Sequence, residues 1–357
     1  MQSLNEKTWE PIAIGLQFNL CRGRESKSTV VEGGKLPFVS AKKTDNGYRM
    51  FVEPAKTKIE GNTISLNNNG DGGAGFGYYQ PYQYTVDVNT TALIPLPHVS
   101  MNPSIGLFWV SCFSWMHEYF GNARTLSNKR AKVTKTMLPV TDSGEPDYEY
   151  MAEYTQQKRE AMLSKYRAYV GERIAELGDP VEIPALDEKE WHEFPLDDIF
   201  TVGAGKRLET RNKVPGTRPF IGATDNGNGV TGFVGNDNAS RDSNVLGVNY
   251  NGAPCIAFYH PYECIFTDDV KRLHLRNYED NKFVLLFFVS VFAQQRSKYS
   301  YGYKFKEQRM LRQKLMLPVT DSGKPDYEYM EQYAKNMILR KYQQYLAFLG
   351  QSDQDTQ

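Results

Sequence analysis

One stretch of 15 residues occurs twice in this chain, almost unchanged. Residues 137–151 read MLPVTDSGEPDYEYM and residues 316–330 read MLPVTDSGKPDYEYM, so the copies differ only at Glu145 and Lys324. They lie 179 residues apart, which is half of the 357-residue chain. An internal repeat of this length constrains the architecture before any single residue can be given a role. The chain is therefore expected to contain two copies of one structural unit.

The similarity between the halves continues outside this motif. The sequence LNEKTW at 4–9 is matched by LDEKEW at 186–191, so both halves begin alike. Aligning TDNG at 44–47 with TDNG at 224–227 makes Lys42 and Lys43 extra residues of the first half. The halves are homologous but diverged. Other matching segments are 37–41 with 219–223, 67–70 with 249–252, and 79–82 with 259–262.

The composition indicates a soluble globular protein without net charge. Hydrophobic residues make up 40% and charged residues 24% of a chain long enough for two domains. The formal net charge is zero, so binding to a polyanion would depend on local basic patches. The four cysteines lack metal-type spacing, the N-terminus lacks the apolar core of a signal peptide, and the longest apolar run, 283–293, is too short to span a bilayer. We expect a cytoplasmic protein with no membrane segment.

The expected fold class is α+β, with each half forming a β-rich globule followed by a long helix. Short β-branched and aromatic runs separated by Asn-Gly and Asp-Gly pairs predict strands joined by tight turns. The apolar segments 105–119 and 283–296 occupy matching positions and predict buried helices packed on the sheets. Predicted strands include 37–40, 61–66, 82–88, 245–250 and 255–259.

A long helix is predicted after each copy of the repeated motif. Pro146 and Asp147 provide a helix start, because proline presets φ and the carboxylate caps the first turn. Apolar residues then recur at helical spacing, which gives helices of roughly 45 Å and 35 Å. Two arrangements remain open: each helix covers the core of its own domain, or the helices pack on each other and hold the globules apart. The predicted boundaries are 1–140 for the first globule, 141–180 for a turn and first helix, 181–319 for the second globule, 320–350 for a turn and second helix, and 351–357 for a disordered tail.

Basic residues are concentrated at matching places in the two halves. The run 124–135 contains no acidic residue, and the run 296–314 contains only Glu307. Two further basic clusters, 22–43 and 206–218, lie near the start of each half. A phosphate backbone is the partner that these runs suggest, because each neutralised phosphate releases counterions. The alternative is a solvated surface on which basic residues cluster by chance.

Polar residues in the predicted loops add candidates for base recognition. Asparagine, aspartate and threonine side chains can contact base edges, although Asn and Asp beside glycine also form turns without any ligand. The candidate DNA-binding residues are Arg22, Arg24, Lys42, Lys43, Asn67, Asn69, Arg124, Lys129, Arg130, Lys206, Arg207, Thr224, Asp225, Asn226, Asn249, Tyr250, Asn251, Lys304 and Lys306.

No catalytic or metal-binding constellation is found in the sequence. The five histidines lack metal-ligand spacing, and no glycine-rich phosphate loop or Asn/Asp-Pro-Pro-aromatic motif of an amino-methyltransferase occurs. The Pro-Asp pairs at 146–147 and 325–326 have no Glu-x-Lys at a range suitable for a nuclease. We therefore predict no catalytic residue and no metal site.

The order of globule, repeated motif and long helix resembles the specificity subunits of multisubunit restriction-modification systems. The architecture is similar to that of type I specificity subunits. The segments 218–227, 243–252, 258–262 and 268–273 are more similar to BcgI-like type IIB specificity subunits. The resemblance covers essentially the whole chain. The first half departs from the pattern by a glycine-rich stretch, 70–77, so the halves are expected to recognise different base sequences.

This resemblance implies that each globule is a target recognition domain docking on one half of a bipartite site on double-stranded DNA. The two helices would pack antiparallel as a spacer. Adenine methylation with S-adenosylmethionine and cleavage with Mg²⁺ would belong to partners, an adenine methyltransferase or fused restriction-modification subunits, so this chain would bind no cofactor directly. The alternatives are a protein-interaction scaffold with incidental basic patches, or a fused nuclease or methyltransferase. The residues expected to pack between spacer, globule and methyltransferase are Tyr148, Tyr150, Met151, Tyr154, Tyr327, Tyr329, Met330 and Tyr333.

Overall fold

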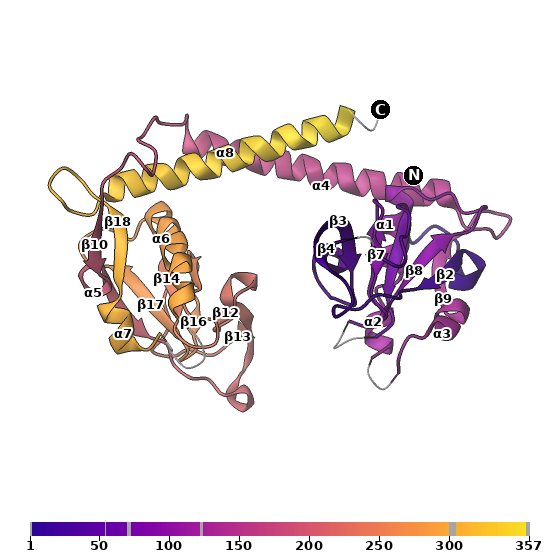
Figure 1. Ribbon diagram of the computed structural model, residues 1–357, viewed down its shortest axis with the longest axis horizontal. Coiled ribbons are helices and arrows are strands. Elements are labelled where there is room, and N and C mark those ends of the chain that lie inside the picture. The colour runs from indigo at the N-terminus through magenta and orange to yellow at the C-terminus, as the bar shows by residue number, and fades with distance from the viewer. Residues whose placement is uncertain (1, 54, 70–72, 122–123, 300–304, 355–357) are drawn as a thin grey trace. The chain divides into compact units, whose positions relative to one another are not determined.

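Each half of the chain folds as a compact unit in the computed structural model (Figure 1). The structure describes residues 2–53, 55–69, 73–121, 124–299 and 305–354. The first unit spans Met1–Tyr166 and the second spans Arg167–Gln357. The boundary between them falls inside one long helix, α4 (Tyr148–Leu177).

The described part of the first unit contains three small β-sheets. Strands β2, β8, β5 and β6 form an antiparallel sheet in that order, β4, β3 and β7 form a second sheet in which β3 and β7 run parallel, and β1 pairs with β9. The strands are β1 (Trp9–Ala13), β2 (Phe18–Arg22), β3 (Glu32–Val39), β4 (Tyr48–Val52), β5 (Thr63–Asn67), β6 (Gly77–Gln80), β7 (Thr85–Val86), β8 (Thr90–Pro95) and β9 (Lys135–Pro139). The helices are α1 (Pro103–Cys112), α2 (Met116–Tyr119) and α3 (Asn128–Val133), with 3-10 turns at Ile14–Leu16 and Asp45–Gly47, followed by α4.

The second unit repeats this topology sheet by sheet. Its sheets have the orders β11-β17-β14-β15, β13-β12-β16 and β10-β18, and β12 and β16 run parallel as β3 and β7 do. The predicted internal repeat is therefore confirmed as a repeat of topology. The strands are β10 (Trp191–Pro195), β11 (Phe200–Ala204), β12 (Pro215–Ile221), β13 (Val230–Val234), β14 (Val245–Asn249), β15 (Ala257–His260), β16 (Ile265–Phe266), β17 (Val270–Leu275) and β18 (Lys314–Pro318). The helices are α5 (Leu196–Ile199), α6 (Lys282–Gln294), α7 (Glu307–Arg312) and α8 (Tyr327–Gln354), with 3-10 turns at Thr210–Asn212, Gly227–Gly229 and Arg296–Lys298.

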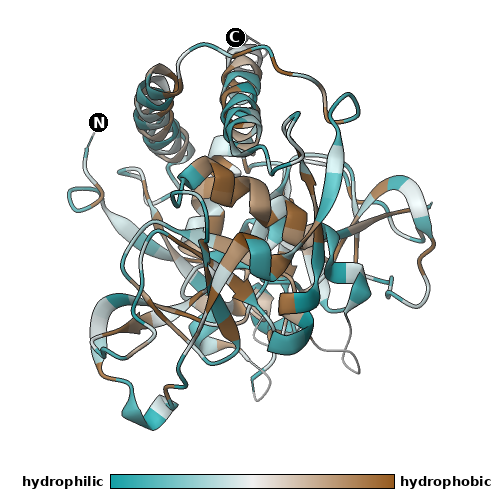
Figure 2. Ribbon diagram, turned by 90° about the vertical axis from the view of Figure 1, so that its left-hand side faces the viewer, coloured by the Kyte–Doolittle hydropathy of each residue, from teal (hydrophilic) through white to brown (hydrophobic). Residues whose placement is uncertain are grey.

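One buried helix packs on the four-stranded sheet of each unit, as the apolar segments predict. In the first unit Trp109 of α1 lies edge-on to Phe18 of β2, with ring centroids 4.9 Å apart. In the second unit Phe288 of α6 contacts Phe200 of β11 in the same way at 4.7 Å. Figure 2 shows apolar residues concentrated on inner helices and strands, with hydrophilic residues on outer turns. The predicted helix 105–119 is divided, since α1 ends at Cys112 and α2 begins at Met116.

The first long helix has its predicted length, and the second is longer than predicted. At 30 and 28 residues, α4 and α8 extend roughly 45 Å and 42 Å. Helix α8 runs to Gln354, beyond the predicted end at 350, because the residues after Gly350 continue the helical backbone. Of the predicted tail, 355–357 lie outside the described residues.

Within the second unit, the last turns of α4 pack against α8. The side chain of Tyr342 is hydrogen-bonded to Tyr169. Val181 follows the end of α4, and its carbonyl oxygen accepts a hydrogen bond of 2.7 Å from Nδ2 of Asn336, which precedes Tyr342 in α8. Because the later position of the first segment meets the earlier position of α8, the two segments run antiparallel here. The buried side chain of Val170 lies on this stretch of α4, whereas Met162 earlier in the helix is 71% exposed.

Candidate nucleic-acid interface

Two loops lie side by side in each unit, and they carry most of the polar residues predicted to read DNA. Loop A joins β3 to β4 at 40–47 and joins β12 to β13 at 222–229. Each copy is closed by a backbone hydrogen bond of 2.9 Å, from Ser40 N to Gly47 O and from Gly222 N to Gly229 O. Loop B runs from the last residue of β5, at 67–76, of which 70–72 lie outside the described residues, and from the last residue of β14, at 249–256.

The two copies of loop A have the same length, which corrects the sequence alignment. Asn46 and Asn228 occupy the same place in the turn, with positive φ values of 54° and 53°. Lys42 and Lys43 are therefore not an insertion, and Lys43 corresponds to Asp225. The TDNG match was misleading, because the identical tetrapeptides do not occupy equivalent positions. The first begins at the fifth residue of its loop and the second at the third residue.

Asn67 and Asn249 are buried anchors of loop A, which corrects their prediction as direct DNA contacts. Asn67 Nδ2 donates to Lys42 O at 3.0 Å, and Asn249 Nδ2 donates to Thr224 O at 2.8 Å. Asn67 is 0% exposed and Asn249 is 2% exposed. A buried amide that satisfies a backbone carbonyl holds the loop in place and does not face a base.

A glycine of loop B brings the two loops together in each unit. A Cβ added to Gly73 would lie 2.9 Å from Ala41 O, and one added to Gly252 would lie 2.9 Å from Ala223 O. Gly252 also has a φ of 70°, a conformation that favours glycine. The approach of loop B to loop A therefore depends on the missing side chain in both copies.

The second unit has a groove of about 880 Å³ between loops A and B. Arg296 and Tyr299 complete it from the segment after α6. The guanidinium of Arg296 lies 3.6 Å from the Asp225 carboxylate. Arg296 was part of a predicted basic run but was not among the candidate residues, because sequence spacing does not reveal its proximity to Asp225. The predicted residues that this groove brings together are Thr224, Asp225, Tyr250 and Asn251.

An adjoining depression of about 490 Å³ extends this surface toward a predicted basic cluster. It is lined by Arg207 and shares Asn251 with the groove. Asn251 Nδ2 donates to Asp269 Oδ1 at 2.9 Å, which fixes the orientation of its amide. Asn226 is exposed on loop A, and Lys206 is exposed beside Arg207.

In the first unit, Lys42 of loop A lines a cleft of about 450 Å³ with Arg49, Asp87 and Asn89. Lys42 is hydrogen-bonded and ion-paired to Asp45, and this bond is the main reason that the pKa of the Asp45 carboxyl is lowered. Lys43 is exposed on the same loop. Asn69 is half-buried in loop B.

The other predicted basic residues do not line that cleft. Arg22 Nε donates to Val88 O at 3.0 Å, and Arg24 is exposed two residues later. The guanidinium of Arg124 lies 3.8 Å from the centroid of the Tyr119 ring. On α3, Lys129 and Arg130 are exposed, and Lys306 is exposed before α7. Lys304 lies outside the described residues.

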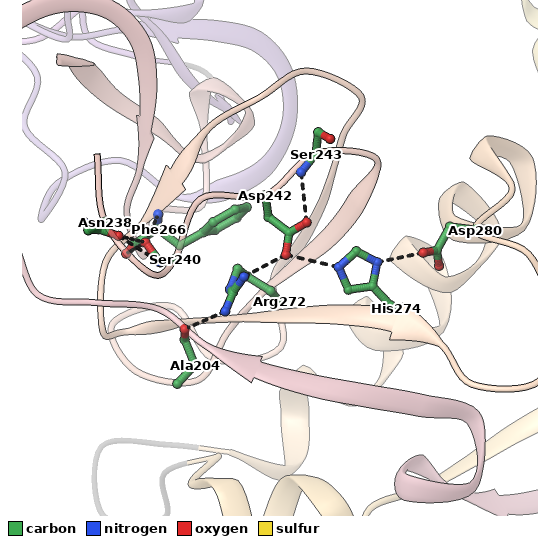
Figure 3. Close-up of polar contacts among 9 residues, drawn as sticks. All are labelled: Ala204, Asn238, Ser240, Asp242, Ser243, Phe266, Arg272, His274 and Asp280. Atoms are coloured by element: carbon green, nitrogen blue, oxygen red, sulfur yellow. Dashed lines mark hydrogen bonds and ion pairs between the residues drawn. The ribbon is translucent and has the colours of Figure 1, made fainter. Parts of the chain in front are cut away.

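The second unit also contains a polar cluster on one face of β17 (Figure 3). The Asp242 carboxylate accepts from Arg272 at 2.8 Å and from His274 Nε2 at 3.1 Å, while His274 Nδ1 lies 2.6 Å from Asp280. The hydrogen bond to Asp280, followed by that to Asp242, raises the pKa of His274 to about 9 despite partial burial. Each carboxylate thus has a cationic partner, so the cluster stabilises the fold of the second unit.

At the positions that correspond to Arg272 and His274, the first unit has the apolar residues Ala92 and Ile94 of β8. Ala92 of β8 pairs with Cys21 and Ser65, as Arg272 of β17 pairs with Gly203 and Gly247. Gly203 leaves room for the guanidinium of Arg272, since a Cβ at this position would lie 2.9 Å from its Nη2. The two units therefore share a backbone but stabilise it with different chemistry.

The start of each long helix is tied to the segment that begins the same unit. Lys7 Nζ donates to Asp147 at 2.6 Å, and Lys189 Nζ donates to Asp326 at 2.7 Å. Asp147 also accepts a hydrogen bond of 3.0 Å from Tyr150 N, so one carboxylate caps the helix and holds the N-terminal segment. The repeated motif is thus a joint between globule and helix in both units.

Aromatic residues of the motif fill this joint. Tyr154 lies edge-on to Phe108 at 5.9 Å, and Tyr333 lies edge-on to Phe287 at 5.8 Å. The remaining residues predicted to pack at the joint, Tyr148, Tyr150, Met151, Tyr327, Tyr329 and Met330, are buried or half-buried beside it.

An apolar groove of about 600 Å³ lies beside the joint of the second unit. Met316 is 44% exposed there, and its counterpart in the first unit, Met137, is 48% exposed. The groove thus places exposed apolar side chains next to the repeated motif. It is lined by Trp191, Phe287, Met316, Tyr333, Met337 and Ile338, among others.

Metal sites and membrane-spanning helices are both absent from the described ranges. No group of three or more His, Cys, Asp or Glu side chains is arranged to hold a metal ion there. None of the helices in the same ranges combines the length and the apolar character needed to cross a membrane.

Two topologically equivalent β-rich folds, each followed by a long helix, define a class of internally duplicated proteins. The family described as Type I restriction modification DNA specificity domain matches residues 6–165 and again 188–346. The chain therefore belongs to this family, whose members are non-catalytic DNA specificity subunits of restriction-modification systems.

Two known proteins illustrate the similarity. The chain is 36% identical over 303 residues to the specificity subunit S.BcgI of the Type II restriction enzyme BgcI from Heyndrickxia coagulans, with 84% of this chain and 85% of that protein covered. It also resembles the S subunit of a Type-I restriction-modification system from M. genitalium, at a TM-score of 0.51 and 17% identity over 100% of this chain and 96% of the other. The first relative supports the family, and the second supports the fold.

Proposed function

We propose that each unit recognises one half of a bipartite target on double-stranded DNA through loops A and B, and that α4 and α8 set the spacing between the halves. The main support is the groove of the second unit, where Thr224, Asp225 and Asn251 meet beside Arg296. Hydrogen-bonding side chains in a concave surface can contact base edges, while nearby cations position the phosphate backbone.

Phosphate contacts are assigned to the exposed cations beside this surface. Arg207 lines the depression that adjoins the groove of the second unit, Lys206 precedes Arg207 in the chain, and Lys306 precedes α7. Each phosphate neutralised by such a side chain releases counterions without distinguishing sequences. Their contribution should therefore be sensitive to salt and independent of base identity.

The partners proposed for this subunit are an adenine methyltransferase and a restriction subunit, or one subunit that fuses both activities. S-adenosylmethionine and Mg²⁺ would be bound by those partners. The apolar groove beside the joint, with Met316 and Trp191, is the proposed contact for the modification subunit. Because the target is cellular or invading DNA, we place the complex in the cytoplasm.

Selection from randomised duplex DNA tests this function. The full chain, alone and in complex with its modification subunit, should enrich duplexes that contain two short fixed sequences separated by a gap of constant length. Enrichment of a single contiguous sequence would contradict the bipartite proposal. Absence of any enrichment with the assembled complex would contradict DNA recognition by this chain.

Salt-dependent binding separates phosphate contacts from base contacts. Replacing Lys206, Arg207 and Lys306 together by glutamine should weaken binding to every sequence and reduce the salt slope by about three, or roughly one for each phosphate that is no longer neutralised. The enriched sequence should stay the same. Lys341→Gln, on the exposed side of α8, is the matched control and should leave the slope unchanged.

A further inference from the structure

We infer that positions 43 and 225 determine which bases the two units prefer. Lys43 selects a guanine in the half-site of the first unit, and Asp225 selects a base with an exocyclic amine, cytosine, in the half-site of the second. The inference rests on the proposed DNA-binding role of loop A. It names the two residues whose side chains make the preferred bases of the two half-sites differ.

The backbone that presents these positions is the same in both units. Each loop A is closed by a hydrogen bond of 2.9 Å between its first and eighth residues. Each is also anchored by a buried asparagine, Asn67 or Asn249, whose amide donates to the third residue of the loop. Since the frame coincides, residues 43 and 225 occupy equivalent places. A difference in recognition at this place must then come from the side chains.

The side-chain charge is reversed at this one position of the shared frame. Lys43 is exposed, and among the described residues it forms no ion pair within 4.0 Å. Its neighbour Lys42 is engaged by Asp45, which is replaced by Gly227 in the second unit. The first loop therefore offers a free ammonium group where the second loop offers the carboxylate of Asp225.

These two groups match opposite features of the major groove. A lysine ammonium donates to guanine, which presents the acceptors O6 and N7, and a carboxylate accepts from the N4 amine of cytosine. Neither group can satisfy the other's base, because an ammonium has no acceptor and a carboxylate has no proton to donate. Reversing the charge on a fixed frame therefore reverses the preferred base.

Arg296 offsets the repulsion between the Asp225 carboxylate and the DNA phosphates. A lone aspartate would be repelled by the phosphate backbone, but the Arg296 guanidinium lies 3.6 Å from Asp225 and both side chains remain about half exposed, at 52% and 53%. The pair presents no net charge, and Asp225 keeps an oxygen atom available. Arg296 thus acts as a positioning residue for the proposed base contact.

Reciprocal substitutions test the assignment. Lys43→Asp and Asp225→Lys should be prepared separately in the full chain, assembled with the modification subunit, and compared with the wild type by selection from randomised duplexes. Lys43→Asp should change one position of one half-site from guanine to cytosine, with loss of discrimination for guanine of about tenfold or more. Asp225→Lys should make the opposite change in the other half-site only.

The outcomes separate this inference from the proposed function. If wild-type protein enriches a bipartite sequence and both variants enrich that same sequence, loop A binds DNA without reading the base and the inference is wrong. If each variant alters both half-sites, the assignment of one loop to one half-site is wrong. If the wild type enriches nothing, the proposed function itself fails.

A second pair of variants tests the frame. Asn249→Asp keeps the size of the side chain but removes the amide that donates to Thr224 O, so it should reduce base discrimination in the second half-site only. Asn67→Asp should do the same in the first. Affinity for non-specific duplex should stay within about twofold of wild type, because phosphate contacts are independent of this hydrogen bond. Equal loss in both half-sites would contradict a local positioning role.

Discussion

Lys7 and Asp147 form an ion pair of 2.6 Å although they are separated by 140 residues. Their side chains are only 13% and 17% exposed. Asp147 also caps α4 through Tyr150 N. One carboxylate therefore connects the segment before β1, the repeated motif and the long helix.

Removing this carboxylate should destabilise the first unit. Asp147→Asn leaves the Lys7 ammonium without its partner, and we expect the free energy of unfolding to fall by about 1–3 kcal/mol. Burial raises the pKa of Asp147, but the hydrogen bonds from Lys7 and Tyr150 outweigh it and hold the pKa below its ordinary value of 3.8. The contribution of this carboxylate to the free energy of unfolding is therefore present above pH 3.8, and it is lost as the pH falls through the lower pKa of the folded state.

Urea unfolding, followed at neutral pH and at pH 3, measures this effect. Asp326→Asn makes the matched change in the second unit and should cost a similar amount. Asp142→Asn, on the exposed turn before α4, is the control. A loss of stability in Asp142→Asn as large as in Asp147→Asn would show that the ion pair is not the cause.

Much of this architecture could be predicted because the repeat is written into the sequence. The motif at 137–151 and 316–330 has the residues of a turn, a capping carboxylate and the first turn of a helix, and local rules translate such patterns directly. The paired sheets could not be ordered from local rules, since strand order depends on contacts distant in sequence. The α4 helix start was therefore predictable, whereas the β11-β17-β14-β15 order was not.

The candidate site was predicted only as a neighbourhood. Asparagine beside glycine signals a loop, but the same signal fits an exposed base contact and a buried anchor. Asn249 is the anchor, whereas Asn251 lines the groove two residues later. Burial distinguishes them, and burial follows from the packing of loop B on loop A. Arg296 was missed as a site residue because its partner Asp225 is distant in sequence.

Protonated His274 should stabilise the second unit, and this stabilisation should be lost in alkaline solution. The hydrogen bond to Asp280 and the contacts with Asp242 raise its folded-state pKa from 6.5 to about 9. The stabilisation is complete below pH 6.5 and is lost as the pH rises through about 9. Because the side chain is partly exposed, we expect about 1–2 kcal/mol.

A pH series of urea unfolding curves for the wild type and His274→Gln checks this expectation. The wild type should lose its excess stability between neutral pH and about pH 9, and the variant should be less stable at pH 6 and show a flatter profile. The first unit, with Ile94 in the corresponding strand, provides an internal control. Parallel profiles for wild type and variant would contradict the assignment to His274.

The apolar groove should be needed for assembly. Met316 is 44% exposed beside the joint, and Met316→Asp would place a charge where the proposed contact with the modification subunit is desolvated. We expect the affinity for the modification subunit to fall by at least about tenfold, which co-purification detects. Binding of the isolated chain to DNA should be unchanged. Met316→Leu preserves the apolar surface and should assemble normally. Normal assembly of the aspartate variant would place the partner contact elsewhere.

The length of α4 should determine the gap between the half-sites. Deleting residues 163–166, directly after the exposed Met162, removes about 6 Å of helix and turns the remainder by roughly 40°. DNA rises about 3.4 Å per base pair, so the preferred gap should shorten by one to two base pairs while both half-site sequences stay the same. Selection from a library with variable gaps measures this directly. A control variant, with residues 163–166 replaced by four alanines, keeps the helical length and should retain the original gap; an unchanged gap in the deletion variant would mean that α4 does not set the spacing.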